Sequence, residues 1–225
     1  MKINIYIDGF NLYYGALKGT SYKWLNLADM CRLLLPEGEI NQIEYFSARV
    51  KARPDDIEQP RRQELYFRAL RTIPNLSIFL GFFSVHKTWM RLAEPMADGT
   101  EKVKVIKTEE KGSDVNIATH MLRDGFLGLY DMAVLISNDS DLCEPLNIVV
   151  NELHLPVGIL NPFEEASKEL VKYAAFTKTI REGVLKVSQF PQTLTDAKGV
   201  FHKPRAWEVI SPDDPNAVQA PAVSP

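Results

Sequence analysis

Short apolar runs alternate with amphipathic segments along most of this chain. Isoleucines at every second position from Ile3 to Ile7 predict a first strand, because side chains alternate between the two faces of a sheet. Further apolar runs predict four more strands, at 40–50, 76–83, 133–136 and 156–160. Helical spacing of apolar residues predicts helices at about 25–35, at about 58–72, from 113, from 142 to about 153, and from about 167.

One stretch, residues 84–107, departs from this rhythm. Its returning arm alternates lysine with valine or isoleucine, and a turn around Ala97-Asp-Gly99 separates the two arms. This pattern predicts a β-hairpin that projects from the sheet. The hairpin has two candidate uses, which are holding a substrate or contacting a second copy of the chain in a homodimer through Trp89 and Met90.

The alternation of strands and helices predicts an α/β fold with a mostly parallel central sheet covered by helices on both faces. From Gln189 onward the pattern weakens, and Phe201 and Trp207 are expected to pack a C-terminal extension back on the body. Residues 211–225 carry four prolines and few large apolar residues, so we expect them to be disordered. We therefore predict a domain at 1–182, an extension at 183–210 and a disordered tail at 211–225.

Composition limits the class of protein. The 225 residues carry a formal net charge of −3, so a nucleic-acid binder of this composition needs a local basic surface. Cys31 and Cys143 have no cysteine or histidine at zinc-site spacing, and we expect both to be buried free thiols in a reducing compartment. There is no signal-peptide pattern and no apolar stretch of bilayer length. These features predict a cytoplasmic protein with no membrane partner.

Two aspartates follow the apolar run at 133–136, where a strand passes into a helix. In an open α/β sheet this is the edge at which ligands bind. Asp139 and Asp141 are two residues apart, so both carboxylates can lean to one side of an extended turn. Two unit charges about 4 Å apart repel by roughly 4 kcal/mol at an effective dielectric near 20, so a cation or a shared proton must offset the repulsion.

The same turn also has a purely structural interpretation. Ser137, Asp139 or Ser140 can cap the next helix, and Asp141 can complement its dipole. Ser137 and Ser140 are the residues that we expect to cap the helix, which leaves both carboxylates free for other work.

Asp8 and Asp114 occupy the same kind of position elsewhere in the chain. Asp8 directly follows the first strand, and Asp114 lies in the first turn of the helix that starts at 113. Because the carboxyl ends of neighbouring parallel strands meet at one edge, Asp8 and Asp139 are expected to converge, with Asp114 joining them. Each acid alone is a common helix cap, but three such segments together favour a metal site over independent caps.

The chemistry of this cluster points to phosphate. Carboxylate ligands without cysteine or histidine favour Mg²⁺ or Mn²⁺, and such ions can activate water for attack on a phosphodiester. From Arg49 to Lys111, 13 Lys and Arg stand against 9 Asp and Glu, a local balance of +4 beside the acids. Lys111 is a candidate phosphate contact, although an ion pair with Glu109 or Glu110 would also explain it. Weaker candidates for holding the strand farther away are Arg61, Arg62, Lys102 and Lys104. Phenylalanine and tyrosine lie at core-like positions and do not indicate a stacking platform for bases.

Four motifs, in matching order and placement, resemble those of the NYN domain family. They are Tyr6-Ile-Asp8-Gly-Phe-Asn11, Glu110-Lys-Gly-Ser-Asp114, Tyr130-Asp131 and Ser137-Asn-Asp-Ser-Asp141. The resemblance covers about residues 1–182 and implies a Rossmann-like, PIN-like nuclease fold. It also implies a ribonuclease dependent on Mg²⁺ or Mn²⁺, whose acids match Asp8, Asp114, Asp139 and Asp141.

His120 departs from the family pattern, because many members carry an aspartate at this helix position. A histidine there can face the site, orient water or contact phosphate, or it can simply be a partly buried side chain near Asp124. The candidate substrate-binding residues are Asn11, Lys111, Asn116, Ser137, Asn138 and His120.

Other protein classes match the pattern less well. A Toprim-like DNA-processing enzyme combines an early acid with a later Asp-x-Asp, but its first acid is normally glutamate and Asp114 would have no role. A haloacid-dehalogenase phosphatase needs Asp-x-Asp where this chain has Asp8-Gly-Phe, and a dehydrogenase needs a glycine-rich turn that is missing. From a different class, a non-catalytic RNA-binding or regulatory module remains an alternative. We predict a ribonuclease whose substrate is single-stranded or structured RNA.

Overall fold

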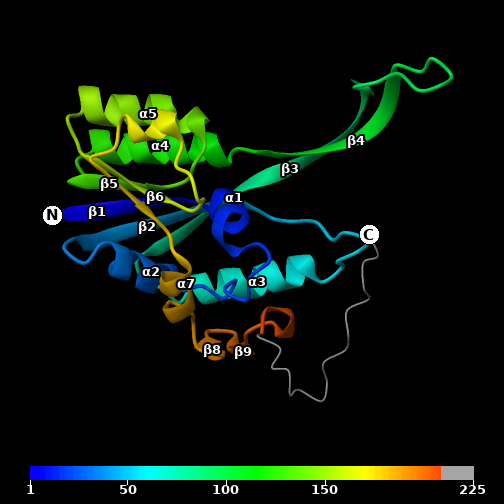
Figure 1. Cartoon of the computed structure of the whole chain (residues 1–225). Helices are drawn as coiled ribbons and strands as arrows, with labels where there is room; N and C mark the ends of the chain where they lie inside the picture. Colours follow the sequence, from blue (N-terminus) through cyan, green and yellow to red (C-terminus); the bar gives the residue numbers. More distant parts are fainter. Residues whose placement is uncertain (209–225) are drawn as a thin grey trace.

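A seven-stranded sheet lies at the centre of the computed structural model, which describes residues 1–208 (Figure 1). Its strands are parallel except for β4, which runs antiparallel to β3. In sheet order they are β4 (Lys102–Lys111), β3 (Leu76–Arg91), β2 (Glu39–Ala48), β1 (Lys2–Asp8), β5 (Met132–Ile136), β6 (Val157–Asn161) and β7 (Phe176–Thr179). The tail predicted to be disordered, 211–225, lies outside the described residues.

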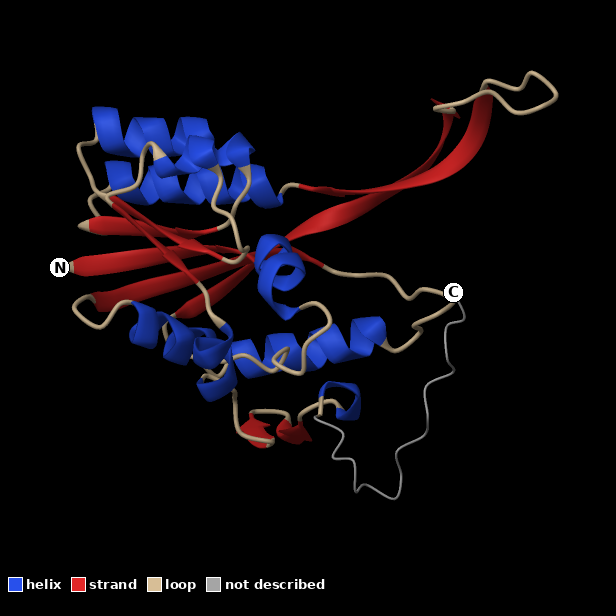
Figure 2. Cartoon of the chain, in the orientation of Figure 1, coloured by secondary structure: helices blue, strands red, loops and turns tan. Residues whose placement is uncertain are grey.

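Helices cover both faces of this sheet, as the sequence predicts (Figure 2). On one side lie α2 (Leu27–Leu34), α3 (Gln59–Leu70) and α7 (Glu182–Val187), and on the other lie α4 (Ser113–Phe126) and α5 (Cys143–Asn147). The short α1 (Gly9–Leu12) continues into a π-helical turn at Tyr13–Leu17, and α5 is preceded by a 3₁₀ turn at Ser140–Leu142 and continues as a π-helical segment at Ile148–Glu152. The prediction of a mostly parallel α/β fold with a projecting hairpin is confirmed. Within residues 1–208, no helix is long and apolar enough to cross a membrane.

The alternation in β1 divides the core in two. Ile3, Ile5 and Ile7 pack under α2 and α3, while Tyr6 packs with residues of α4 and α5. Asp8 continues the alternation on the side of Tyr6, which is the side that α4 covers. The strand is therefore buried on both faces, as expected for the middle of a parallel sheet.

The projecting arm differs in detail from the prediction of a separate hairpin after a strand at 76–83. β3 is one continuous strand of 16 residues. Its pairing with β2 ends at Gly81, and from Phe82 to Arg91 it pairs only with β4. This two-stranded ribbon leaves the body, as Figure 1 shows, so neither of its faces has the burial that marks a strand in a sequence.

The prediction that 156–160 is the last parallel strand was wrong. A further strand, β7, pairs parallel to β6, and the helix expected from about 167 is only the short α6 (Lys168–Val171). β7 is four residues long, lies at the sheet edge and is mostly exposed. Such a strand carries no apolar period that a sequence pattern could detect.

The segment after α7 lies under α3. It contains the hairpin β8 (Thr193–Asp196) and β9 (Gly199–His202) and a 3₁₀ turn at Arg205–Trp207. Phe201 and Trp207 both pack against the ring of Trp24, with centroid distances of 6.3 and 6.2 Å. Arg68 of α3 donates two hydrogen bonds to Asp196, at 2.8 and 2.7 Å, and ties the hairpin to the body.

Both cysteines are free. Cys31 is buried as predicted, whereas Cys143 is only partly buried at the start of α5.

Candidate functional site

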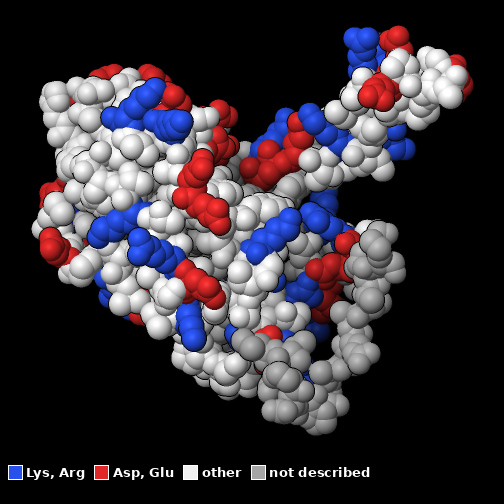
Figure 3. Space-filling view, viewed as in Figure 1, with Lys and Arg blue, Asp and Glu red and all other residues white. Residues whose placement is uncertain are grey.

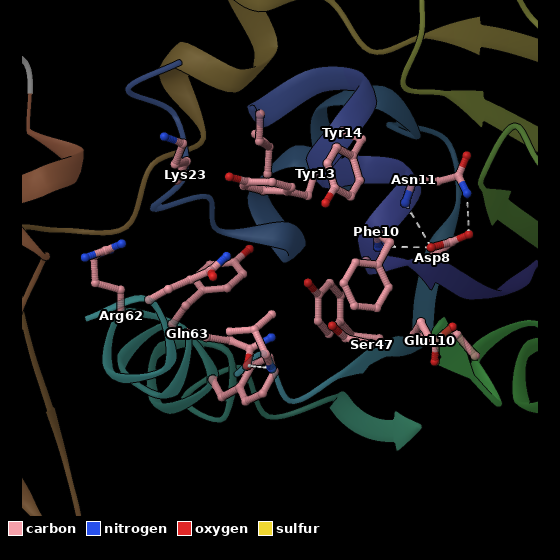
Figure 4. Close-up of a pocket in the computed structure, with 18 of the residues that line it drawn as sticks. Asp8, Phe10, Asn11, Tyr13, Tyr14, Lys23, Ser47, Arg62, Gln63 and Glu110 are labelled. Carbon is pink, nitrogen blue, oxygen red and sulfur yellow. Dashed lines mark hydrogen bonds between the residues drawn. The ribbon is translucent and has the colours of Figure 1, made fainter. Parts of the chain in front are cut away.

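A cavity of about 490 Å³ opens at the carboxyl ends of β1 and β2. Four of the carboxylates that line it form an acidic cluster, from the end of β1 (Asp8), the end of β4 (Glu110), the first turn of α4 (Asp114) and the turn after β5 (Asp139). Figure 4 shows Asp8 and Glu110 at one end of this cavity. The structure thus brings together three of the four predicted acids and adds Glu110.

Asp8 is the most constrained of the four carboxylates. It is only 2% exposed and caps α1, because its Oδ1 accepts hydrogen bonds from the backbone N–H groups of Phe10 (3.0 Å) and Asn11 (2.9 Å). Its Oδ2 accepts hydrogen bonds from Asn11 Nδ2 (2.6 Å) and Ser137 Oγ (3.2 Å). Burial raises the pKa of Asp8, and these hydrogen bonds oppose the shift.

The turn after β5 differs from the expected capping arrangement. Asp139 is itself the cap, since its Oδ1 accepts a hydrogen bond from the backbone N–H of Asp141 at 3.0 Å. Ser137 Oγ accepts from the backbone N–H of Asp139 at 3.1 Å while donating to Asp8, so it joins the two acidic turns. Ser140 is exposed and makes no cap. The prediction that both carboxylates stay free of capping was therefore wrong for Asp139.

The pKa of Asp114 reflects its burial and the charges of the neighbouring carboxylates. Burial raises the pKa of this carboxyl to about 6, and the neighbouring carboxylates add to the shift. In order of their effect these neighbours are Asp8, Asp139, Glu110 and Asp141. Asp114 stands in the first turn of α4 after Gly112, whose φ of 102° lets the chain turn sharply from β4 into the helix.

Glu110 was missed as a site residue, although it belongs to a motif that carried the family resemblance. Its Oε1 accepts a hydrogen bond from Ser113 Oγ at 2.9 Å. A Cβ on Gly81 would lie 2.4 Å from the Lys111 carbonyl oxygen and 2.6 Å from this Oε1, so the glycine in β3 allows the end of β4 to approach closely. The sequence did contain a signal for this residue. Side chains alternate along a strand, so Glu109 and Glu110 point to opposite faces of β4, and one of the two could have been expected to face the site.

Asp141 is exposed and does not line the cavity. Its effect on Asp114 is the weakest of the four neighbouring carboxylates. It is therefore placed at the rim of the cluster rather than inside it.

His120 does not line the cavity, and its side chain is partly buried, as in the structural alternative that the sequence left open. Its Nδ1 is 2.9 Å from Glu44 Oε2, and its ring lies against Phe46 and Phe79. Burial lowers the pKa of His120, and it raises the pKa of Glu44 to about 7. The expected neighbour Asp124 is instead bound to Tyr6 Oη at 2.9 Å and to Arg123.

The remaining candidates serve the framework around the acids. Asn11 Oδ1 accepts from the backbone N–H of Asn138 at 3.2 Å. The Asn138 side chain in turn bonds the backbone at Glu165 and Ser167. Lys111 is exposed and lies 4.0 Å from Glu109, as the ion-pair alternative anticipates.

Four more predicted basic or polar contacts lie away from the cavity. Asn116, although it lies on α4, is not among the residues that line the cavity, and Lys102 and Lys104 lie on the projecting arm. Arg61 pairs with Glu58 outside the cavity.

The cavity continues from the acids to a basic end. Arg62, whose side chain is 19% exposed, pairs there with Asp56, and Lys23 and Arg53 line the same region. Burial lowers the pKa of Lys23, and the charge of Arg62 lowers it further. The cavity wall also carries aromatic rings, those of Phe10, Tyr13, Tyr14, Tyr45, Tyr66, Phe67, Phe83 and Trp207. Figure 4 shows Phe10, Tyr13 and Tyr14 between the acidic and the basic end. The sequence did not indicate this gathering, because the rings come from segments far apart in the chain.

The acids fit a divalent cation by donor type, since hard oxygen ligands suit Mg²⁺ and Mn²⁺. Within residues 1–208, however, no three His, Cys, Asp or Glu side chains are placed so that they could hold a metal ion together. Mg²⁺ is commonly bound by one or two carboxylates, with water and substrate phosphate completing its coordination. The convergence of Asp8, Asp114 and Asp139 on one cavity is compatible with that incomplete kind of site. On the face shown in Figure 3, acidic side chains also gather where the arm leaves the body.

The known proteins that are similar to this chain agree with the observed fold, but the name of one of them suggests a different kind of activity from the one that the family suggests. The NYN domain family model matches residues 2–180, which confirms the resemblance seen in the motifs. A curated relative, 6-hydroxy-3-succinoylpyridine 3-monooxygenase HspA of Pseudomonas putida (strain DSM 28022 / S16), is 29% identical over 92% of this chain and 75% of its own length. The crystal structure of a protein of unknown function, VPA0982 from Vibrio parahaemolyticus RIMD 2210633, is 17% identical, with a TM-score of 0.52, and the match covers 80% of this chain and 93% of that one. This last likeness concerns the fold alone.

Proposed function

This chain belongs to the NYN domain family, and we propose that it is a metal-dependent nuclease that hydrolyses phosphodiester bonds in RNA. The observation that carries the proposal is the convergence of four carboxylates from four separate segments on one cavity beside basic side chains. Asp8 and Asp139 each cap a helical turn, but Glu110, at the end of β4, caps no helix, so capping alone does not account for the whole cluster. The raised pKa of Asp114 supports the proposal, because the charges of its neighbours contribute to that shift.

In this proposal one or two of the carboxylates of Asp8, Asp114 and Asp139 hold Mg²⁺ or Mn²⁺, water and the substrate phosphate complete its coordination, and Asp141 contributes from the rim. The bound ion would supply charge compensation at the phosphate and activation of water. Ser137 and Asn11 position the Asp8 carboxylate through hydrogen bonds to its Oδ2. Arg62, Arg53 and Lys23 attract the phosphate backbone toward the cavity.

The first test is Asp139→Asn. Asparagine keeps an oxygen that can cap the 3₁₀ turn at Ser140–Leu142, so the fold is expected to survive while metal-dependent cleavage of labelled RNA is lost. Cleavage is measured with Mn²⁺, with Mg²⁺ and with chelator, and circular dichroism checks the fold. Undiminished cleavage by a clean preparation of this variant would show that Asp139 has no part in metal-dependent cleavage.

A second candidate is oxygenation of a small aromatic compound, which the 29% identity to a protein named as a monooxygenase favours. The aromatic cavity wall is compatible with such a substrate. Oxygen uptake with 6-hydroxy-3-succinoylpyridine and an electron donor distinguishes the two reactions. Uptake that depends on this substrate, without any RNA cleavage, would replace the nuclease proposal.

A further inference from the structure

We propose that the aromatic and basic part of the cavity is a subsite for one unpaired nucleotide, with its base among the aromatic rings and a phosphate at the basic end. The inference rests on the proposed function, because it names the part of the RNA held next to the acids. It also narrows the substrate class from RNA in general to RNA with an unpaired nucleotide at the cut site.

The size of the cavity supports a single nucleotide. Its volume of about 490 Å³ falls in the range of roughly 300–1,000 Å³ that is usual for small-ligand pockets. A base-paired helix cannot enter a space of this size. A strand can reach the acids through it only if one base leaves its stack.

The charges of the cavity are divided between its ends, which gives a nucleotide one orientation. Lys23, Arg53 and Arg62 stand against the single carboxylate of Asp56 at one end, so this end has a local excess of positive charge. Figure 4 shows Lys23 and Arg62 on the side opposite Asp8 and Glu110. Two cations held close to each other are stabilised by an anion, and a phosphate has the geometry that arginine binds best.

The region between the ends offers rings and an unused acceptor for a base. Tyr13 and Tyr14, in the π-helical turn, lie edge to face with centroids 5.3 Å apart, and Tyr14 is exposed. Gln59 lines the same cavity, and its Oε1 is buried without a hydrogen-bond partner within residues 1–208, so this oxygen becomes available to a base once the side chain turns toward the cavity. A stacked base with an amino group matches both features, because aromatic rings take any base and the amide oxygen accepts from an exocyclic amine.

The C-terminal segment completes the wall. Trp207 lines the cavity and packs on the rings of Trp24 and Tyr66, each at a centroid distance of 6.2 Å. An indole placed in the wall also provides a signal, since a ligand that stacks nearby changes its fluorescence.

The experiment measures binding in the Asp139→Asn background with chelator present, so that neither cleavage nor metal is required. Fluorescence anisotropy compares a labelled single-stranded RNA, the same RNA in a blunt duplex, and free AMP and UMP as competitors. We expect the single strand to bind at least tenfold tighter than the duplex, and the mononucleotides to compete.

Two variants and two matched controls test the residues. Arg62→Gln and Tyr14→Ala are expected to weaken single-strand binding roughly ten- to a hundredfold, the range expected for one lost phosphate contact or one lost stacked base. Arg71→Gln removes an arginine that also pairs with an acid but lies outside the cavity, and Phe126→Ala removes an exposed ring on α4. Both controls are expected to bind like the parent.

Equal affinity for single strand and duplex would overturn the proposal. So would a loss in the two controls that matches the loss in Arg62→Gln and Tyr14→Ala. Competition by an aromatic carboxylate such as nicotinate, with none by AMP or UMP, would assign the cavity to a small aromatic acid instead. Intact single-strand binding combined with no cleavage under any metal would reject the proposed nuclease function while leaving the subsite in place.

Discussion

The Asp8 carboxylate accepts hydrogen bonds from two backbone N–H groups, from Asn11 Nδ2 and from Ser137 Oγ. It therefore fixes the start of α1 and the turn after β5 while it lines the cavity. Replacing Asp8 would therefore affect stability and function at the same time, because the four hydrogen-bond donors lose their partner. Asp114 and Asp139 have fewer partners, which makes them the cleaner probes of function.

Asp114→Asn separates stability from activity. Because the folded protein holds the pKa of Asp114 at about 6, above its ordinary value of 3.8, ionising this carboxyl destabilises the fold as the pH rises between those values. In metal-free buffer at pH 8, the variant is expected to be more stable than the parent by about 1 kcal/mol, discounted for the partial exposure of the group. The gain should vanish below about pH 4, as measured by urea unfolding at the two pH values.

Two further measurements complete that test. Metal-dependent cleavage by the parent is expected to rise with pH through about 6, as Asp114 ionises, and to be absent in the variant. Asp55→Asn, which removes an exposed acid outside the cavity, is the matched control and should change neither property. A variant that gains no stability at pH 8 contradicts the electrostatic account of the cluster.

At the scale of elements, the contact between α1 and β2 sets the position of Asp8. A Cβ on Gly9 would lie 2.6 Å from the Tyr45 ring and 2.7 Å from the Phe46 carbonyl oxygen. Gly9→Ala must therefore push α1 away from the sheet, and we expect a loss of about 2 kcal/mol or more in unfolding free energy, together with reduced cleavage. Thermal unfolding followed by circular dichroism measures the loss.

Gly183 in α7 provides the opposite case. An added Cβ there meets no atom within 4 Å, so Gly183→Ala is expected to stabilise the protein by about 0.5–1 kcal/mol through helix propensity alone. Equal effects of the two substitutions would show that contact with β2 does not restrain α1.

The individual strands show which parts of the fold can be predicted from the sequence and which cannot. β1, β2, β5 and β6 were predictable because their apolar residues are buried, and the acids that follow β1 and β5 were placed by sheet geometry. β7 and the outer part of β3 were not, since exposed strands have no buried face to impose a period. The pairing of His120 with Glu44, 76 residues earlier, depends on the packing of α4 over β2, which no local pattern records.

For the whole molecule, the C-terminal hairpin is part of the core beneath α3. Phe201 is buried, packs on Trp24 and lies 4.1 Å from the Arg68 guanidinium. Phe201→Ala is expected to lower the unfolding free energy by about 3–5 kcal/mol, whereas Val200→Ala, at an exposed neighbour, should change it by less than about 0.5 kcal/mol. Urea unfolding monitored by tryptophan fluorescence measures both.

That prediction also reaches the cavity, because Trp207 lines it from the same segment. If Phe201→Ala unfolds like the parent, the hairpin packs only loosely on α3. Trp207 would then not be held in a fixed position in the cavity wall.

The long ribbon of β3 and β4 is anchored at one end only, where Glu110, Gly112 and Asp114 follow one another into the site. Its outer pairs, such as Met90 with Val103, have no core beneath them, whereas the pair of Phe82 with Lys111 adjoins the body. Amide protons along the ribbon should therefore exchange with deuterium in a gradient, fastest at the tip and slowest at the root. The tip is then free to fray on a short timescale while the carboxylates at the root keep their positions.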